Sequence, residues 1–272
     1  MACRCPDELP RVMPAGILDV LLAVLYPPRC PLCGRDLARA RGPAVCRGCL
    51  ARLPVLPPGC PTCAEPGPRR PCDRCAASPP THAAAHACLA YRRGARACPL
   101  RRALLRWKYR ADHAAGAALL RIFRECAARV PLDARVVVAV PADRARRIAR
   151  GFEPARLLAA EAARAHHLPI VDALRRAERS VDQVALGRTG RQANVRAAFS
   201  ARRTAALRDA RVLLVDDVVT TGATAEACAR ALSRAGAARV ELLTLARTVR
   251  CSKSANFLPS APSPLEDCNF CR

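Results

Sequence analysis

The sequence predicts an α/β protein in which a parallel sheet is flanked by helices and preceded by a small cysteine-rich module. Three observations predict this fold. Short apolar runs alternate with segments of helical periodicity over residues 79–250, an order typical of parallel sheets with right-handed crossovers. Eight cysteines form four C-x2-C pairs ahead of that region. A buried-strand pattern at residues 211–215 ends in two adjacent carboxylates and a Thr/Gly turn.

Length and charge limit the alternatives. The 272 residues have room for one medium domain and a small appendage. The net charge of +24, nearly all from arginine, suits a nucleic-acid or polyphosphate partner. An Ala/Arg/Pro-rich composition is equally typical of a GC-rich coding sequence, so charge alone leaves both interpretations open.

Residues 1–29 are predicted to form an N-terminal segment with a short amphipathic helix at 16–26. The apolar run at 17–26 is interrupted by Asp19, has no cleavage site after it, and is too short to span a bilayer. We therefore expect a cytoplasmic protein without a transmembrane segment. In that compartment clustered cysteines bind metal rather than form disulfides.

The cysteine pairs predict two structural zinc sites in a double zinc-ribbon module at residues 30–78. Each C-x2-C turn brings two thiolates to one ion, and two pairs complete a tetrahedral site. Few apolar residues lie between the pairs, so metal must supply the folding energy. Pairing in sequence order gives one zinc on Cys30, Cys33, Cys46 and Cys49 and a second on Cys60, Cys63, Cys72 and Cys75; an interleaved pairing is the alternative.

Residues 79–250 are predicted to form the main domain. Trp107 and Tyr109 lie between cations in a basic helix, where they either stack a base or anchor the helix, and anchoring is favoured. Four cysteines without pair spacing (Cys88, Cys98, Cys126 and Cys228) are expected to be small core residues.

The order of elements along this domain follows from the same patterns. In its first half we expect an edge strand at 87–92, helices at 98–109 and 114–129, a buried strand at 135–141, an arginine-dense loop at 143–152 and a helix at 154–166. In its second half we expect a short strand near 170, a mobile loop and short strand at 179–199, the strand at 211–215, a helix at 225–235 and a last strand at 239–245. Residues 251–272 are expected to be a disordered tail.

The acidic strand end and the following turn predict a site for a phosphorylated sugar. Amides at the start of the helix and the open backbone of Gly222 suit a phosphate. Like charges repel, so Asp216 and Asp217 suit sugar hydroxyls or a divalent cation instead. An ordinary strand-to-helix turn is one alternative. A receiver-type domain is another, but it needs an Asp after a later strand, which residues 239–247 lack.

Two loops are expected to meet at this site. Ligands of open parallel sheets bind outside the carboxyl ends of the strands. The arginine-dense loop follows Val140, and the acidic turn follows Val215. Cations and carboxylates should therefore converge at one edge of the sheet.

The strand, the acidic pair and the Thr-Thr-Gly-x-Thr turn resemble the signature by which type I phosphoribosyltransferases bind 5-phosphoribosyl 1-diphosphate (PRPP). With the cysteine pairs, Lys108-Tyr109, Arg150-Gly151-Phe152 and the polar stretch from Gln183 to Phe199, the chain resembles the ComF family over about residues 16–250. Members usually follow Arg-Gly-Phe with Asn and Gln, whereas this chain has Glu153 and Pro154.

The resemblance implies a type I phosphoribosyltransferase-like fold that binds PRPP with Mg²⁺, with possible transfer of phosphoribose to a nitrogen acceptor. The catalytic residues it implies are Asp216, Asp217, Arg147 and Arg150. The PRPP-binding residues it implies are Asp216, Asp217, Val218, Thr220, Thr221, Gly222, Ala223, Thr224, Arg188 and Arg191.

The resemblance also implies a role in natural competence. Single-stranded DNA and competence helicase or recombination proteins would then be partners. A PRPP-sensing regulator and a non-catalytic nucleic-acid-binding accessory protein are the alternatives. The acceptor and the oligomeric state do not follow from the sequence.

Overall fold

The computed structural model describes residues 28–37, 45–92, 98–177 and 198–249. Several predictions lie outside these ranges: the helix at 16–26, the polar loop with Arg188 and Arg191, and the C-terminal tail. Among the described residues, no helix combines the length and the apolar character needed to cross a membrane.

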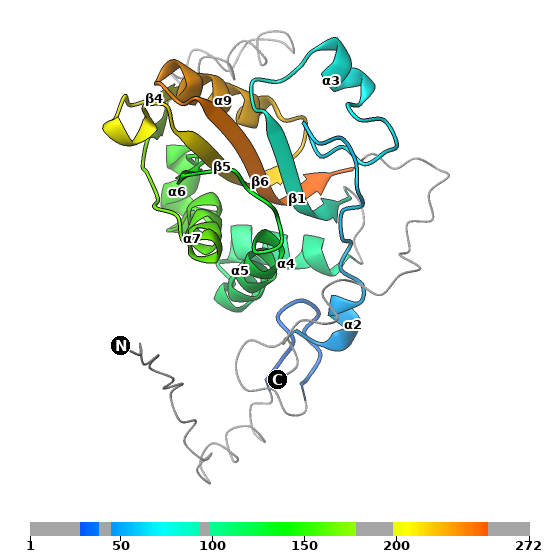
Figure 1. The fold of residues 1–272 in the computed structure, drawn as a ribbon. Coiled ribbons are helices and arrows are strands. Elements are labelled where there is room, and N and C mark those ends of the chain that lie inside the picture. Colours follow the sequence, from blue (N-terminus) through cyan, green and yellow to red (C-terminus); the bar gives the residue numbers. More distant parts are fainter. Residues whose placement is uncertain (1–27, 38–44, 93–97, 178–197, 250–272) are drawn as a thin grey trace, which may run out of the picture.

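The centre of the molecule is a four-stranded sheet in the order β1-β6-β5-β2 (Figure 1). All three strand pairings are parallel, and Val215 of β5 lies opposite Ala139 of β2 and Leu243 of β6. The predicted α/β class is therefore confirmed, and β1 is the expected edge strand. The strands are β1 (Ala84–Tyr91), β2 (Val136–Ala139), β5 (Arg211–Val219) and β6 (Arg239–Thr248).

Helices cover both faces of this sheet, and the alternation of side chains along β5 separates the two cores. Leu213 and Val215 pack with α4 (Pro99–Arg110), α5 (His113–Ala127) and α7 (Pro154–His166). Val212 and Leu214 pack on the other face with α9 (Ala223–Arg234). Successive strand residues point to opposite faces, so an unbroken apolar run serves two cores.

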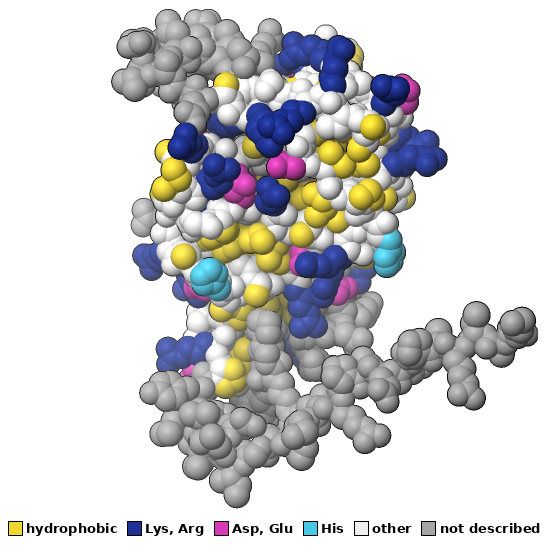
Figure 2. Space-filling model, turned by 90° about the vertical axis from the view of Figure 1, so that its left-hand side faces the viewer, with side chains coloured by type: hydrophobic (Ala, Val, Ile, Leu, Met, Phe, Trp, Pro, Cys, Tyr) yellow, Lys and Arg dark blue, Asp and Glu magenta, His cyan; other side chains and the backbone are white. Residues whose placement is uncertain are grey.

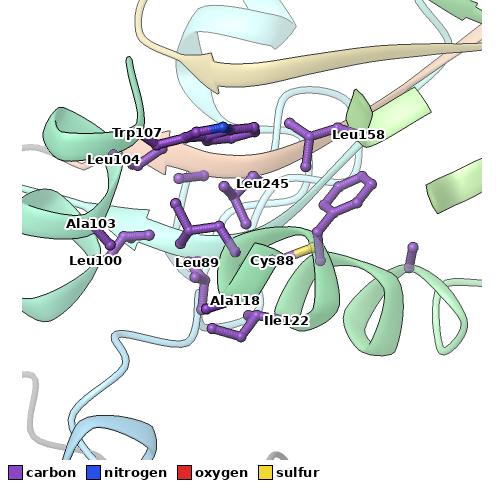
Figure 3. Packing of buried hydrophobic residues seen from close by; sticks show 14 of the residues in the cluster. Cys88, Leu89, Leu100, Ala103, Leu104, Trp107, Ala118, Ile122, Leu158 and Leu245 are labelled. Carbon is purple, nitrogen blue, oxygen red and sulfur yellow. The ribbon is translucent and has the colours of Figure 1, made fainter. Parts of the chain in front are cut away.

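Trp107 anchors α4 inside the first of these cores (Figure 3). Its side chain is almost fully buried, and its ring stacks on Phe152 with centroids 5.8 Å apart. Gly116 of α5 lies against the indole, where an added Cβ would collide with the ring. The anchoring interpretation of Trp107 is confirmed, whereas Tyr109 is exposed.

The arginine-dense segment after β2 is a helix, α6 (Arg144–Arg150), so the prediction of a loop was wrong. Asp143 caps this helix by accepting a hydrogen bond from the Ala145 amide at 3.1 Å. Gly151 ends it in the left-handed conformation, with φ of 74°. None of its residues is buried, and for that reason no apolar periodicity marked it in the sequence.

Two other segments differ from the expectation. Ile170 forms a single parallel bridge to Val137 rather than a strand. β5 continues through both aspartates to Val219. A small antiparallel pair joins β3 (Leu174–Arg176) to β4 (Phe199–Ala201), and a 3-10 turn, η2, follows at Ala205–Leu207.

The cysteine-rich segment carries two short helices, α2 (Arg47–Leu50) and α3 (Asp73–Ala77). Figure 1 shows α3 on the side of the molecule where α9 lies, and α2 far from it. Between them the chain joins the edge of the sheet through an antiparallel bridge from Val55 to Leu89. The segment is therefore fastened to the sheet.

Candidate functional site

The turn after β5 is an open helix N-terminus. Gly222 precedes α9 with φ of 85°, a left-handed conformation that favours glycine, and a Cβ there would meet nothing within 4 Å. Gly222 offers no side-chain cap to the first turn of α9. Thr220, Thr221 and Ala223 are exposed, so among the residues that the structure describes no side chain fills the turn. Such a terminus, with its amides and dipole, can hold an anion.

The two carboxylates before this turn face different surroundings. Asp217 Oδ2 lies 2.6 Å from Lys108 Nζ of α4, whereas Asp216 Oδ1 accepts the backbone N–H of Asp217 at 2.8 Å. Both acids are partly buried. The strand therefore directs Asp217 toward α4 and leaves Asp216 toward the α9 face.

Asp216 is protonated more readily than an ordinary carboxyl group. Burial, followed by the charge of Asp217, raises its pKa to about 7, although the Asp217 amide, Lys108 and Arg176 act in the opposite direction. Near neutral pH this carboxyl therefore exists in both forms. A ligand that donates hydroxyl hydrogen bonds would favour the ionised form.

The predicted catalytic arginines lie on α6. Arg147 is exposed and lines a cavity of about 830 Å³, whereas the Arg150 guanidinium lies 5.3 Å from the centre of the Tyr109 ring. The segment after β2, α6, and β3 with its flanking residues bound this cavity. The charged residues of its lining are Asp143, Arg144, Arg147, Glu153, Arg156, Asp172, Arg175 and Arg176.

The cavity does not include the signature turn. None of residues 216–224 lines it, so the structure brings Arg147 to a neighbouring space rather than onto the carboxylates. Figure 2 shows this side of the molecule, where Lys and Arg side chains are interspersed with acidic ones rather than gathered in one continuous patch. The predicted cations and carboxylates therefore do not meet at one site but lie in two adjoining regions.

The eight paired cysteines form two four-sulfur clusters, each with sulfur atoms within 4.8 Å of one another. They combine in sequence order, which excludes the interleaved pairing. The Cys33–Cys46 and Cys63–Cys72 sulfurs are 3.7 and 3.6 Å apart. Tetrahedral zinc with bonds of about 2.3 Å needs sulfurs about 3.8 Å apart, so both clusters fit the ion.

One thiol in each cluster ionises easily even without metal. Burial opposes ionisation of Cys60, yet hydrogen bonds from the backbone of Cys72, Cys63 and Thr62 lower its pKa to about 6. Burial also opposes ionisation of Cys33, whose pKa is lowered to about 6 by the Arg35 backbone and the neighbouring thiols. A thiolate is therefore ready in each cluster for a first metal bond.

The sequence matches the phosphoribosyl transferase domain family over residues 116–258, just over half of the 272 residues. The chain belongs to the phosphoribosyl transferase domain family. The match covers the cavity, both aspartates and the α9 turn. A second match, to the double zinc ribbon domain, covers residues 21–92 and includes both cysteine clusters.

No curated protein matches the sequence. Three solved structures that match it are each less than 25% identical to it. The Bacillus subtilis glutamine PRPP amidotransferase complexed with ADP and GMP is 23% identical over 48% of this chain and 26% of its own, with a TM-score of 0.37. TT1426 from Thermus thermophilus is 20% identical over 52% and 86%, with a TM-score of 0.30. The purine phosphoribosyltransferase from Pyrococcus horikoshii is 18% identical over 52% and 83%, with a TM-score of 0.27. This chain thus spans about a quarter of the amidotransferase chain.

The sequence analysis did not assign the contacts of three residues at this candidate site. Glu153 accepts the Ala142 amide at 3.2 Å and so closes the segment after β2 onto the start of α7. Lys108 pairs with Asp217, and Arg74 donates to the Thr221 carbonyl at 2.9 Å. The Arg-Gly-Phe motif indicated the region of Glu153, and the family resemblance included Lys108. No local signal identifies the partner that such a cation contacts across the fold.

Proposed function

We propose that this protein binds PRPP at the α9 turn, as a phosphoribosyltransferase-like protein of the ComF type. One observation carries the proposal: Asp216 and Asp217 lie in the last part of β5, and the turn that follows leads through Gly222, in the left-handed conformation, into the exposed N-terminus of α9. The turn offers amides for a phosphate, and the acids offer acceptors for ribose hydroxyls.

Roles follow from this placement. Val218, Thr220, Thr221, Gly222, Ala223 and Thr224 would bind the 5′-phosphate. Asp216 and Asp217 would accept hydrogen bonds from the ribose hydroxyls and favour positive charge developing on the ring. Arg147 and Arg150, with Arg188 and Arg191, would stabilise negative charge on the diphosphate.

Mg²⁺ fits such a site, because carboxylate and diphosphate oxygens are the ligands it prefers. When bound, it would neutralise charge on the diphosphate. In a transfer reaction the bond from ribose C1 to the diphosphate oxygen breaks, and a nitrogen acceptor forms the new bond and loses a proton. The exposed turn and the 830 Å³ cavity beside α6 leave space for both reactants.

We further propose that the clusters hold two structural zinc ions: one on Cys30, Cys33, Cys46 and Cys49, the other on Cys60, Cys63, Cys72 and Cys75. The fit of their sulfur separations to tetrahedral zinc supports this assignment. These ions would stabilise short segments that have little apolar core of their own.

A second candidate function is a cytoplasmic DNA-handling role in natural competence, with PRPP as a regulatory ligand. The net charge of +24 favours it, because such a charge attracts single-stranded DNA. Competence helicase or recombination proteins would then be partners. Binding to DNA should weaken steeply with salt under this candidate.

Titration calorimetry with PRPP and Mg²⁺ tests the first proposal. Wild-type protein should bind saturably, and Asp216→Asn with Asp217→Asn should weaken binding about tenfold or more, since charge-assisted hydrogen bonds are lost. Asp133→Asn is the control, because Asp133 pairs with Arg211 at the opposite end of β5. Absence of saturable binding by the wild type would overturn the proposal. Release of diphosphate on adding a nucleobase would favour transfer over a binding role.

A further inference from the structure

Arg74 connects the second cysteine cluster (Cys60, Cys63, Cys72 and Cys75) to the turn between β5 and α9. This turn, residues 220–222, is called the phosphate turn below. Arg74 lies on α3 between Cys72 and Cys75, and its Nη1 donates to the Thr221 carbonyl at 2.9 Å across 147 residues of sequence. The same guanidinium interacts with the sulfur of Cys63. Arg74 therefore connects the segment between two predicted metal ligands, Cys72 and Cys75, to the backbone of the turn.

The contact to Thr221 orients the next amide. A peptide unit is planar, and in the trans form its C=O and N–H point in opposite directions. Among the described residues, the single cis peptide is Arg70–Pro71, so the Thr221–Gly222 unit is trans. Because the Thr221 carbonyl accepts from Arg74, the Gly222 N–H of the same peptide unit is directed away from the Arg74 guanidinium.

Two further contacts fasten the same region. Glu226, in the first turn of α9, accepts the backbone N–H of Thr81 at 2.8 Å and its hydroxyl at 2.7 Å. Glu65, two residues after Cys63, accepts two hydrogen bonds from Arg247 at the end of β6. The Arg247 side chain is only 3% exposed. The segment that carries the second cluster is thus also bound to α9 and to β6.

The position of Arg74 depends on the geometry of the cluster. The buried residues of this small core are Cys60, Cys63 and Cys75, with Cys72 packed against them. An ion held by these four sulfurs fixes the turn that carries Arg74. The first cluster differs, because Cys30 and Cys49 pack into the main core with Leu32, Val45 and Leu53.

We propose that Arg74 is a positioning residue through which the metal-bound second cluster holds the phosphate turn in its anion-binding conformation. The part of this proposal that concerns PRPP rests on the proposed function. It deepens that function, because it makes the affinity for PRPP depend on the second cluster. Loss of metal there would release Arg74 and let the Thr221–Gly222 peptide rotate. The first cluster would have no such effect.

The test compares Arg74→Ala with Arg47→Ala in the full-length, zinc-loaded protein. Arg47 is the matched control because it lies between Cys46 and Cys49 of the first cluster. We expect both variants to keep two zinc equivalents. Arg74→Ala should speed hydrogen exchange of the amides at 220–225 about fivefold and weaken PRPP binding about fivefold, as expected for one lost hydrogen bond. Arg47→Ala should change neither quantity.

Hydrogen exchange in the PRPP-free protein distinguishes the positioning role of Arg74 from the proposal that the protein binds PRPP. If the wild type fails to bind PRPP but Arg74→Ala still loosens residues 220–225, the coupling stands and the PRPP assignment fails. If Arg74→Ala keeps two zinc equivalents, wild-type exchange and wild-type affinity, the coupling is overturned. Equal loosening of the turn by Arg47→Ala would also overturn it, because the effect would not be specific to the second cluster.

Discussion

Lys108 Nζ lies 2.6 Å from Asp217 Oδ2, and the two side chains are only 16% and 18% exposed. The pair connects the last turn of α4 to the end of β5, so it holds one of the two proposed ribose-binding acids against the helix that Trp107 anchors. An ion pair this close to the core is costly to break, because the remaining charge keeps little of its hydration.

Lys108→Met is therefore expected to lower the free energy of unfolding by about 2 kcal/mol, since it leaves Asp217 half-buried without its partner. Adding Asp217→Asn should restore at least half of the loss. Denaturant unfolding of the two single variants and the double variant measures this coupling. Arg156→Met is the control: its pair with Asp172 is 62% and 56% exposed, and its loss should change stability by less than about 0.5 kcal/mol. Wild-type stability of Lys108→Met would contradict the prediction.

Asp216→Asn is expected to stabilise the protein at alkaline pH while weakening PRPP binding. The folded pKa of Asp216, about 7, lies above the ordinary value of 3.8. Between these values the folded state holds more protons, so stability from this group is fully present below about pH 4 and is lost as pH rises through 7. Asn carries no such charge.

The gain from Asp216→Asn should accordingly be close to zero near pH 4 and about 4 kcal/mol at pH 8, because each pKa unit between 3.8 and about 7 corresponds to about 1.4 kcal/mol. The rise in Tm at pH 8 should be about 8 °C or more. Thermal unfolding at both pH values, for wild type and variant, measures the difference. A variant that is less stable than wild type at pH 8 would show that the Asp216 carboxylate is stabilised in the fold rather than penalised.

Zinc stoichiometry gives a third prediction. Cys49→Ser and Cys75→Ser should each reduce zinc from two equivalents to one, because each removes a ligand from a different cluster. Cys98→Ser is the control: Cys98 is the N-cap residue of α4, a position that serine suits, so both zincs and stability should be kept. Elemental analysis of purified protein gives the counts. Two zincs in either cluster variant would refute the assignment.

Local patterns in the sequence predicted much of this structure and the composition of both cysteine clusters. The helix Pro154–His166 has the predicted bounds, since a proline at its start and an apolar face mark it. Helix α6 has no buried residue, so only its caps, Asp143 and Gly151, identify it. The pairs Lys108–Asp217 and Arg74–Thr221 join residues far apart in a chain with 46 Lys and Arg. Local patterns cannot select among so many cations, because the choice depends on which segments the fold brings together.

Gly116→Ala is expected to lower the stability of the protein, although helix propensity favours alanine over glycine. Alanine is favoured over glycine in a helix interior by about 1 kcal/mol, yet a Cβ at Gly116 would collide with the Trp107 indole. Gly116 is buried in α5 and Trp107 is buried in the core that α5 covers, so relief of the collision requires the indole to move off Phe152. We expect a loss of about 1–3 kcal/mol, as for other overpacked cores.

Fluorescence provides the measurement for Gly116→Ala, because Trp107 is the only tryptophan of the chain. Denaturant unfolding followed through its emission should show the lower stability, together with a shifted emission maximum in the native state. Gly48→Ala in α2 is the control: its Cβ would lie 3.7 Å from Arg35 Nη2, an ordinary contact, so it should be neutral or slightly stabilising. If Gly116→Ala matched that control in stability and emission, the prediction would be wrong, because the core would accommodate the added methyl group without displacing the indole.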